Sequence, residues 1–433
     1  MTVQTQRPVM VCFGPGPAFK GGISNYNTSL ALALHKQGAK VYVVSWTQQY
    51  PALIPRDFKD KQSKSDVFEG TDIEVIYVTN YNNPFTWSKT VRLIQSLKPQ
   101  KVIFQWAIAI QGLPLGYIAR KLCRWGQTEV IFDCHLVVQK EGSILDTRFS
   151  KFGLKHAHTY LLHAYKTVEE LKSLLDLRGA VINEDGERAT GQQKTLIKLY
   201  HPVYDLFKPD PNFNVEEEKK KLHLKKHVFL FFGFIRKYKG LHQVIEAFHI
   251  LQKKRPDVSL LIVGESFWNT LPASSITAKL KNFLFGLAKK LFLKKSDDER
   301  QYNPLSLIDT LGLSEHVTVV NDFVPNEEVH RYFQVSDYIM LYYLTATPSG
   351  VESLSYNFSL PVLATRVGHF PETIKEGYNG YLARDRDLED MAQVMEKALD
   401  IPINRAHVVH TAQKLSWDNY ALAVLKPKSI PGL

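Results

Sequence analysis

The stretch from His227 to Gly264 constrains the fold of this chain more than any other. It reads HVFLFFGFIRKYKGLHQVIEAFHILQKKRPDVSLLIVG. Two apolar runs, 228–232 and 260–263, have the length and composition of buried parallel strands. Between them, apolar residues recur at helical spacing from Leu241 to Phe248. The stretch therefore predicts one β-α-β unit, and with it a parallel sheet.

The turn between the first strand and the helix of this unit is basic, because it contains Arg236, Lys237 and Lys239. In an open α/β sheet such turns face the ligand, and a helix N-terminus favours anions. Fixed positive charges from Lys and Arg point to a phosphate or diphosphate as that anion. A solvated basic loop would have the same spacing, so both interpretations stay open at this point.

Short apolar runs alternate with helical periodicity in both halves of the chain, which favours two doubly wound parallel sheets. At 433 residues the chain is also too long for one ordinary core. Strands are expected at 9–13, 41–46, 73–79, 102–106, 129–133, 160–163, 228–232, 260–263, 317–320, 338–341, 361–364 and 380–382. Helices are expected at 25–37, 116–124, 152–158, 168–175, 215–226, 241–248 and 388–399. The charged, glycine-containing region 178–194 is expected to be a surface excursion.

The basic turn resembles the donor-binding loop of retaining GT-B glycosyltransferases, specifically glycosyltransferase family 4. That loop has the form G-x-x-R-x-x-K-G, and Gly233, Arg236, Lys239 and Gly240 fill it in order. The resemblance implies that Arg236 and Lys239 hold the diphosphate of a nucleotide-sugar. Many family members place the arginine directly after the first glycine, where this chain has Phe234.

The resemblance runs from Val9 to roughly Leu399 and implies the GT-B architecture. This is an α/β fold of two facing, Rossmann-like, doubly wound domains with an interdomain cleft. The expected domains are residues 1–200 on the acceptor side and residues 201–410 as the nucleotide-sugar donor domain, with a basic amphipathic insertion at 266–300. A C-terminal tail over 411–433 could cross back to the N-terminal domain.

The loop before the first helix, GPGPAFKGGISNY, contains the pair Gly21 and Gly22. Paired glycines let backbone amides approach an anion or a sugar without obstruction by a β-carbon. A plain tight turn would also use them. The string is similar to the family's GG-I-x-x-Y loop, which implies that Gly21 and Gly22 contact the donor phosphate.

His135 directly follows the predicted strand 129–133 in the segment FDCHLVVQKE. A lone histidine is more often structural, but the carboxyl end of a parallel strand is where ligands bind. His135 resembles the family's strand-end histidine, which contacts the transferred sugar near the reaction centre, and it is the expected catalytic residue. Leu136 stands where relatives commonly have Asn. Glu141 is close enough to contact the sugar or acceptor, whereas His163 is expected to be a core residue.

The segment TATPSGVESLSYNFSLPVLATRVGHFPE, residues 345–372, is the second informative stretch. It predicts a short helix that begins near Ser349, Gly350 and Val351, where backbone amides and a hydroxyl would suit a phosphate. The segment is similar to the family's donor region, which contains P-V-x-A-T-x-V-G. The resemblance therefore implies that Ser349, Gly350 and Val351 bind the donor diphosphate.

The same segment departs from the usual family pattern of two glutamates eight positions apart. Those two positions hold Ala346 and Leu354. The resemblance is thus to a branch in which S-G-V replaces the paired acids. Glu352, the nearby carboxylate, is a candidate contact for the sugar, and a solvent-facing role is the alternative.

These residues suit retaining glycosyl transfer, which passes through an oxocarbenium-like state. In the family, the leaving diphosphate itself is thought to accept the acceptor's proton. The protein then needs cations and amides that stabilise departing negative charge, here Lys239, Arg236 and 349–351. The sequence has no DxD or other metal-ligand cluster, so neither a metal nor another cofactor is expected.

The insertion after Gly264 has no acidic residue from 266 to 296, and six lysines fall within 276–295. Its apolar residues follow helical spacing, which indicates a basic amphipathic helix. Such a helix is a candidate anchor on an anionic membrane. A helix packed on its own domain, with a solvated lysine face, is the alternative.

Bulk properties narrow the function further. The net charge of +11 suits a polyanionic partner, but no zinc-finger or RNA-recognition signature accompanies it, so nucleic acid is not expected. There is no apolar run of about 20 residues, no secretory signal, and no disulfide or metal pattern among Cys12, Cys123 and Cys134. The expected place is the cytoplasm, or the inner face of the membrane as a peripheral protein.

The sequence therefore predicts a retaining, hexosyl-type glycosyltransferase. It would move a sugar from a nucleotide-diphosphate donor to a glycan or lipid-linked acceptor in polysaccharide biosynthesis. The alternatives are a sugar-nucleotide epimerase or a phosphorylase of the same architecture, and a non-catalytic sugar- or lipid-binding scaffold.

Overall fold

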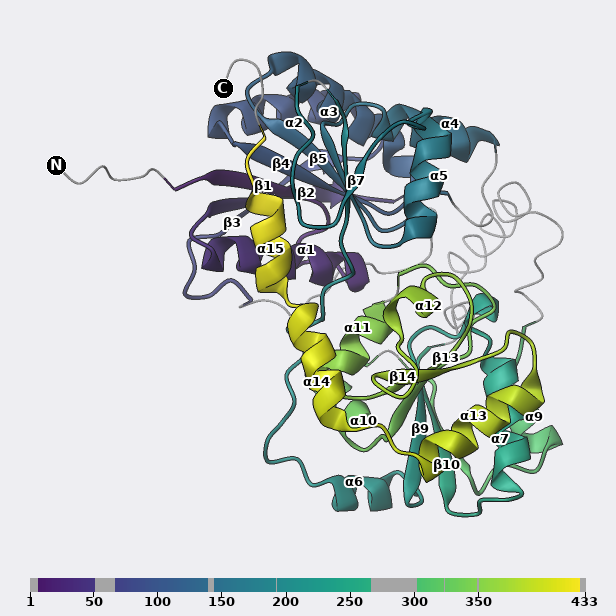
Figure 1. Ribbon diagram of the computed structural model, residues 1–433. Helices are drawn as coiled ribbons and strands as arrows, with labels where there is room; N and C mark the ends of the chain where they lie inside the picture. The colour runs from purple at the N-terminus through teal and green to yellow at the C-terminus, as the bar shows by residue number, and fades with distance from the viewer. Residues whose placement is uncertain are drawn as a thin grey trace, which may run out of the picture. The chain divides into compact units, whose positions relative to one another are not determined.

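The structure, a computed structural model, describes residues 7–50, 67–138, 144–191, 193–265, 302–322, 324–348 and 350–428. These residues form two compact α/β units (Figure 1). The described parts of 1–200, together with 416–428, make the first unit, and the described parts of 201–415 make the second. The prediction of two parallel sheets is confirmed, because every strand pair in both units is parallel.

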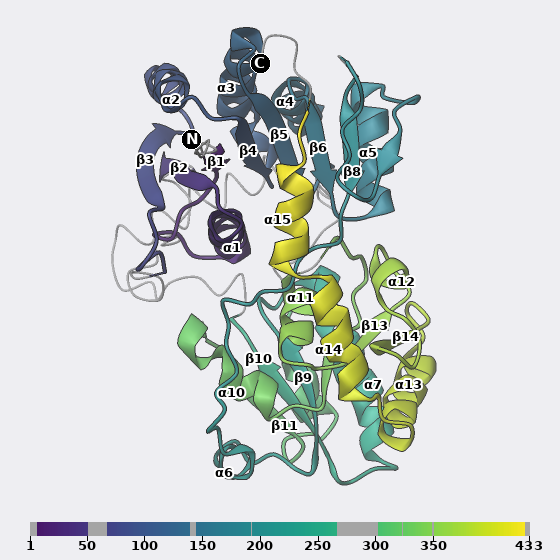
Figure 2. The ribbon, with the colours of Figure 1, turned by 60° about the vertical axis from the view of Figure 1, so that its left-hand side comes forward.

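The first unit is an eight-stranded sheet in the order β3-β2-β1-β4-β5-β6-β8-β7. Its strands are β1 (Val9–Phe13), β2 (Lys40–Gln48), β3 (Glu74–Asn80), β4 (Lys101–Trp106), β5 (Glu129–Cys134), β6 (Thr159–Leu162), β7 (Ile182–Asn183) and β8 (Thr195–Lys198). Its helices are α1 (Gly22–Lys36), α2 (Pro84–Leu97), α3 (Gly112–Trp125), α4 (Ile144–Leu154), α5 (Tyr165–Leu175) and α15 (Trp417–Leu425). In Figure 2, α1 and α15 lie on one face of this sheet, and α2 and α3 lie on the other.

Both faces of the first sheet are covered, which explains the uninterrupted burial of its central strands. All six residues of β4 and all six of β5 are buried, as expected for a parallel sheet between two helical layers. Aromatic rings fill the core, and Phe104 stacks on Phe132 with the ring centroids 5.1 Å apart. Each fully buried ring of this kind contributes about 1.5–3 kcal/mol to folding.

Two expectations for the first unit are wrong. The helix expected at 152–158 is α4, which ends at Leu154. Lys194 ends it by donating from Nζ to the carbonyls of Lys155 and Ala157, both at 2.9 Å. The region 178–194 is more than a surface excursion, because the buried Arg188 guanidinium donates to Glu129 at 2.8 Å.

The second unit is a six-stranded sheet in the order β11-β10-β9-β12-β13-β14. Its strands are β9 (His227–Phe232), β10 (Val258–Val263), β11 (Val317–Val320), β12 (Tyr338–Leu341), β13 (Val362–Thr365) and β14 (Gly380–Ala383). Its helices are α6 (Val215–Lys221), α7 (Leu241–Gln252), α9 (Ser306–Thr310), α10 (Val329–Gln334), α11 (Gly350–Asn357), α12 (Phe370–Thr373), α13 (Leu388–Asp400) and α14 (Arg405–Lys414).

The strand orders define where ligands are expected. Each sheet grows in one direction from its first strand and then reverses, between β1 and β4 in the first unit and between β9 and β12 in the second. Ligands of doubly wound sheets bind outside the carboxyl ends of the strands at such a switch point. In the described part of the chain, no helix is both long and apolar enough to span a bilayer.

Candidate functional site

The loops at the switch point of the second sheet are 233–240, after β9, and 342–349, after β12. They are tied together by a hydrogen bond from the Leu344 amide to the Tyr238 carbonyl, 2.8 Å long. Gly240 separates the short 3-10 turn Lys237–Lys239 from α7 and has a φ of 65°. A β-carbon there would lie 2.0 Å from the Tyr342 carbonyl oxygen. Only glycine fits this position, and it sets the path of the basic turn.

Lys239 is buried at this point, with only 8% of its surface exposed. Burial, aided by the nearby charge of Arg236, lowers the pKa of Lys239 to about 8. Its Nζ lies 6.0 Å from the centroid of the Tyr343 ring. Among the described residues, no carboxylate lies within ion-pair distance of Lys239. A buried cation without a counter-charge is costly, so this position favours an anion.

The Lys239 ammonium group lies close to Gly233, and Val351 of α11 lies near the same glycine. A β-carbon on Gly233 would lie 2.8 Å from Lys239 Nζ and 3.8 Å from Val351 Cγ2. Helix α11 begins at Gly350, so the first amides of that helix lie at the carboxyl edge of the sheet. Ser349 lies outside the described residues. Arg236 starts the same 3-10 turn, where its guanidinium carbon is 5.6 Å from the centroid of the Tyr238 ring.

Glu352 lies in the first turn of α11 and is 4% exposed, so it does not face solvent. One of its oxygens is 2.6 Å from His369 Nε2, and the other accepts a hydrogen bond from the Tyr356 hydroxyl at 3.1 Å. Because carboxylate oxygens only accept, His369 donates from Nε2. His369 Nδ1 is buried and has no hydrogen-bond partner among the described residues. Sequence reasoning did not find His369, which adds a second polar group beside the expected Glu352.

In the first unit, the loop after β1 is held by Ser45 and Ser24. The Gly16 amide donates to Ser45 Oγ at 2.7 Å, and Ser24 Oγ donates to the Gly16 carbonyl at 2.7 Å. Gly21 caps α1 with a φ of 105°, and the helix begins at Gly22. Both glycines are exposed, and a β-carbon on Gly21 would meet nothing within 4 Å. Both glycines thus lie at the exposed start of α1.

His135 follows the last residue of β5, and its backbone amide donates to the Trp106 carbonyl at 3.0 Å. Its Nε2 lies 2.7 Å from Gln105 Oε1. Burial lowers the pKa of His135 to about 4, although Asp133 opposes the shift, so the ring is neutral at pH 7. Since the amide oxygen of Gln105 accepts, Nε2 carries the proton and Nδ1 carries the lone pair.

A buried pair of polar side chains, Asp133 and His163, lies next to His135. His163 Nε2 lies 2.8 Å from Asp133 Oδ1, and His163 Nδ1 lies 3.0 Å from the Leu199 carbonyl oxygen. Both partners of the His163 ring are hydrogen-bond acceptors. Burial raises the pKa of Asp133, but the charge and hydrogen bond of His163, the nearby His135 and the hydrogen bond from Tyr420 together outweigh it, so the net shift is downward. Tyr420 completes the pair by donating to Asp133 Oδ2 at 3.0 Å.

His163 is thus a core residue, as expected, but its ring lies 5.5 Å from that of His135. Sequence reasoning missed the link through Asp133. Glu141 and the insertion 276–295 lie outside the described residues. The described residues contain no group of three or more His, Cys, Asp and Glu side chains that could hold a metal ion.

Comparison with known structures identifies the fold. The crystal structure of Anabaena HepE in complex with UDP superposes with a TM-score of 0.61 at 13% identity, over 96% of this chain and 97% of that one. The two units therefore have the GT-B fold. Within it, residues 213–415 match the family model described as "Glycosyl transferases group 1". This segment is a glycosyl transferases group 1 domain.

Two curated relatives are similar in sequence. Spore coat protein SA of Bacillus subtilis (strain 168) is 26% identical over 246 residues, which is 54% of this chain and 56% of the relative. The D-inositol 3-phosphate glycosyltransferase of Arthrobacter sp. (strain FB24) is 26% identical over 225 residues, 51% of this chain and 45% of the relative. The chain spans about half the length of the curated relatives it matches.

Proposed function

We propose that this protein transfers a sugar from a nucleotide-diphosphate-sugar to a hydroxyl of a glycan or lipid-linked acceptor, with retention of configuration. The observation that carries the proposal is Lys239, a buried cation without a described counter-charge at the switch point of the second sheet. Its surroundings favour a ligand of at least one negative charge. The UDP complex of the structural neighbour HepE supports a nucleoside diphosphate as that ligand.

The proposed reaction needs little covalent chemistry from the protein. The bond between the sugar's anomeric carbon and the diphosphate oxygen breaks, and its electron pair stays on the diphosphate. The acceptor oxygen bonds to the same carbon, and its proton passes to the departing diphosphate oxygen. Lys239, Arg236 and the first amides of α11 stabilise the charge that develops there, an effect worth about 3–4 kcal/mol for a single well-placed group.

The sugar requires hydrogen-bonding groups rather than charges. His369 offers a buried Nδ1 without a described partner, and Glu352 fixes that ring by accepting from its other nitrogen. We assign Glu352 a positioning role through His369 rather than direct contact with the sugar. Both carboxylate oxygens of Glu352 already have hydrogen-bond partners, Tyr356 and His369, which agrees with a positioning role.

The roles of the first unit rest on the sequence resemblance and remain proposals. Gly21 and Gly22 would contact the donor phosphate through the amides at the start of α1. His135 would contact the transferred sugar near the reacting carbon, with its ring held by the hydrogen bond between Nε2 and Gln105 Oε1. The cytoplasm, or the inner membrane face, is the proposed location.

Ligand-induced thermal stabilisation tests the proposal. UDP-, GDP- and ADP-sugars are added to wild-type protein, Lys239→Gln and Lys237→Gln, the last of which removes a charge from the same turn. At about 100 times Kd a ligand adds about 2.7 kcal/mol to the free energy of unfolding. One donor class should raise the melting temperature of wild type and Lys237→Gln but not of Lys239→Gln. If no donor stabilises the wild type, or if Lys239→Gln responds equally, the assignment is wrong.

A measurement of donor hydrolysis separates an enzyme from a scaffold. In the absence of acceptor, the protein should slowly release nucleoside diphosphate from the donor that stabilises it. Binding without any release, with or without a panel of glycan acceptors, would identify a non-catalytic scaffold. The sugar released with the nucleoside diphosphate is also identified. A sugar of the original configuration indicates hydrolysis or transfer, whereas an epimerised free sugar would identify an epimerase.

A further inference from the structure

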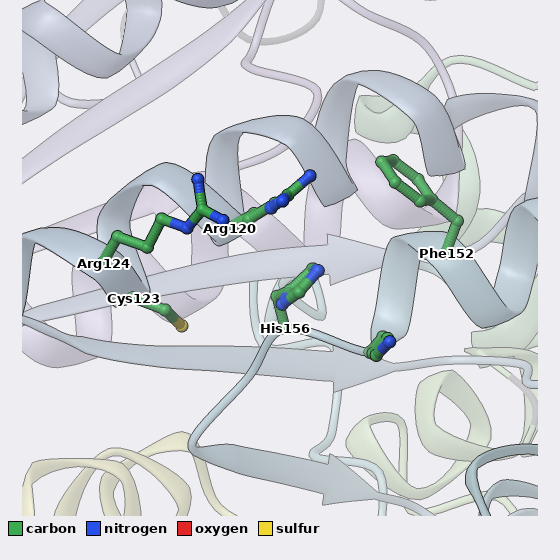
Figure 3. A pocket seen from close by; sticks show the side chains of 6 residues that line it. Arg120, Cys123, Arg124, Phe152 and His156 are labelled. Atoms are coloured by element: carbon green, nitrogen blue, oxygen red, sulfur yellow. The ribbon is translucent and has the colours of Figure 1, made fainter.

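A second concave site lies in the first unit, away from the strand ends discussed above. It is a cavity of about 400 Å³ between α3, the end of α4 and the loop that follows α4. Figure 3 shows Arg120 and Arg124 reaching over it from α3, with Phe152 of α4 at the other side. The lining residues are Arg120, Cys123, Arg124, Phe152, Lys155 and His156.

This cavity is not part of the candidate donor site. Arg124 lies in the last turn of α3, and His156 lies three residues before β6. Helices that follow parallel strands run back toward the amino ends of the sheet. The cavity is therefore at the amino edge of the first sheet, whereas His135 and Gly21 lie at the carboxyl edge.

The walls of the cavity are held rigidly because α3 and α4 cross at glycines. A β-carbon on Gly116 would lie 2.7 Å from Phe152 Cδ1, and one on Gly153 would lie 2.6 Å from Trp106. Such close approach fixes the backbones of α3 and α4 against each other. The exposed side chains of Arg120, Arg124 and Lys155 extend from this packed pair into the rim of the cavity.

The charge of the cavity is positive and uncompensated. Among the described residues, none of the side chains of Arg120, Arg124, Lys155 and His156 forms an ion pair or hydrogen bond. Burial lowers the pKa of His156, and the charges of Lys155, Arg120, Lys194 and Arg124 lower it further. Because all four of these neighbours are cations, the electrostatic potential at His156 is positive.

Basic residues near helix C-termini are common because they interact favourably with the helix dipole. That explanation suits Lys194, whose Nζ donates to the carbonyls of Lys155 and Ala157 just after α4. The helix dipole does not explain Arg120, which lies more than a turn before the end of α3. It also does not explain why basic residues of α3 and of the loop after α4 line one cavity.

We propose that the cavity lined by Arg120, Arg124, Lys155 and His156 binds a phosphate group, carried by a small organic molecule. Guanidinium groups pair with phosphate oxygens in a bidentate manner, and two arginines four residues apart on α3 present two such forks from one helical face. The half-buried Cys123 and the Phe152 ring provide an apolar surface for the rest of the molecule. A volume of about 400 Å³ is within the range of small-molecule sites.

Cys123 provides a reporter within the cavity, because Cys12 and Cys134 are buried in the core. Native full-length protein is treated with iodoacetamide, and carboxamidomethylation of Cys123 is followed by mass spectrometry. Because burial raises the pKa of Cys123 to about 11, the reaction is run near pH 9. Glycerol 3-phosphate is the phosphate probe, and glycerol is its uncharged control.

At about ten times its Kd, glycerol 3-phosphate should slow the alkylation of Cys123 roughly tenfold, because only the unoccupied fraction reacts. The variant Arg120→Gln/Arg124→Gln should lose this protection. Lys121→Gln is the matched control, since Lys121 is an exposed cation of the same helix outside the cavity. It should keep the protection. Equal protection by glycerol, or protection that survives in the double variant, would overturn the proposal.

A second arm distinguishes the source of the phosphate. Phosphatidylglycerol vesicles replace glycerol 3-phosphate, with phosphatidylcholine vesicles as the control. Protection by the soluble probe identifies a free phosphorylated ligand, and arginine-dependent protection by phosphatidylglycerol alone identifies a lipid headgroup. Both results support the phosphate site. If neither the soluble probe nor the anionic vesicles protect Cys123, there is no such site.

A third measurement needs no ligand. Iodoacetate carries a negative charge and iodoacetamide does not, so the ratio of their rates at Cys123 reports the local potential. Relative to a free cysteine peptide, the ratio should be raised severalfold in the wild type and in Lys121→Gln. It should fall toward the peptide value in Arg120→Gln/Arg124→Gln. A wild-type ratio equal to that of the peptide would contradict the uncompensated charge.

Discussion

The affinity of the protein for a nucleoside diphosphate should fall steeply above pH 8, because Lys239 must be protonated to bind it. Burial holds the pKa of this lysine near 8, whereas an exposed lysine titrates near 10.4. At pH 7 about nine-tenths of the free protein carries the charge, and at pH 9 about one-tenth does. If only the protonated form binds, affinity falls about tenfold over this range, or about 1.4 kcal/mol. An exposed lysine would produce almost no change.

Isothermal titration calorimetry at pH 7 and pH 9 measures the change in affinity directly. The ligand is UDP or whichever nucleoside diphosphate stabilises the protein best. The ligand does not titrate in the range, since the second pKa of a phosphate is about 6. A bound diphosphate raises the pKa of Lys239 again, so binding at pH 8.5 should take up about three-quarters of a proton. Buffers of different ionisation enthalpy reveal this uptake.

Two variants make the test specific. Lys239→Arg keeps a charge that does not titrate, so its affinity should be independent of pH between 7 and 9. Lys239→Gln should bind weakly at every pH. An unchanged wild-type affinity from pH 7 to pH 9, or the same decline in Lys239→Arg, would refute the buried-lysine reasoning.

Three further predictions follow from the same residues. Since the pKa of Lys239 is depressed in the folded state, this residue should add up to about 3 kcal/mol to the free energy of unfolding as the pH rises from 8 to 10.5. The contribution is measured by urea unfolding as the difference between wild type and Lys239→Met, and the ligand-free variant should be the more stable of the two at pH 7. His135→Ala should reduce turnover more than nucleotide affinity, and a collapse of UDP or GDP affinity in a folded variant would place His135 in the nucleotide site instead. Replacement of the six lysines in 276–295 by glutamate should abolish co-sedimentation with anionic vesicles, an attraction that salt screens within about 8 Å at physiological ionic strength; equal sedimentation with neutral vesicles would contradict an electrostatic anchor.

The sequence predicted the strands well, because buried parallel strands are continuous apolar runs that local reading detects. Residues 228–232 and 260–263 became β9 and β10 with boundary changes of one or two residues. The helix expected at 152–158 was displaced, since its end depends on Lys194, which is 39 residues from Lys155. Long-range capping of this kind leaves no local signal.

The candidate site was predictable only where its residues are consecutive in sequence. The turn from Gly233 to Gly240 could be read directly, but the burial of Lys239 depends on β12 and α11, which are distant in sequence. The Asp133–His163 pair depends on the register of β5 against β6. His369 is 17 residues from Glu352 and reaches it only because the loop after β13 folds over α11.

The most direct test of the central claim is the rate of nucleoside diphosphate release from the stabilising donor, followed by phosphorus NMR with and without acceptor. The proposed chemistry predicts that wild type and Lys237→Gln release nucleoside diphosphate, rather than monophosphate or sugar 1-phosphate. Lys239→Gln should be slower by a factor of about 100 or more, the effect of losing one electrostatic stabiliser of the leaving group. Equal rates in Lys239→Gln and wild type, or no release from any nucleotide-sugar, would contradict it.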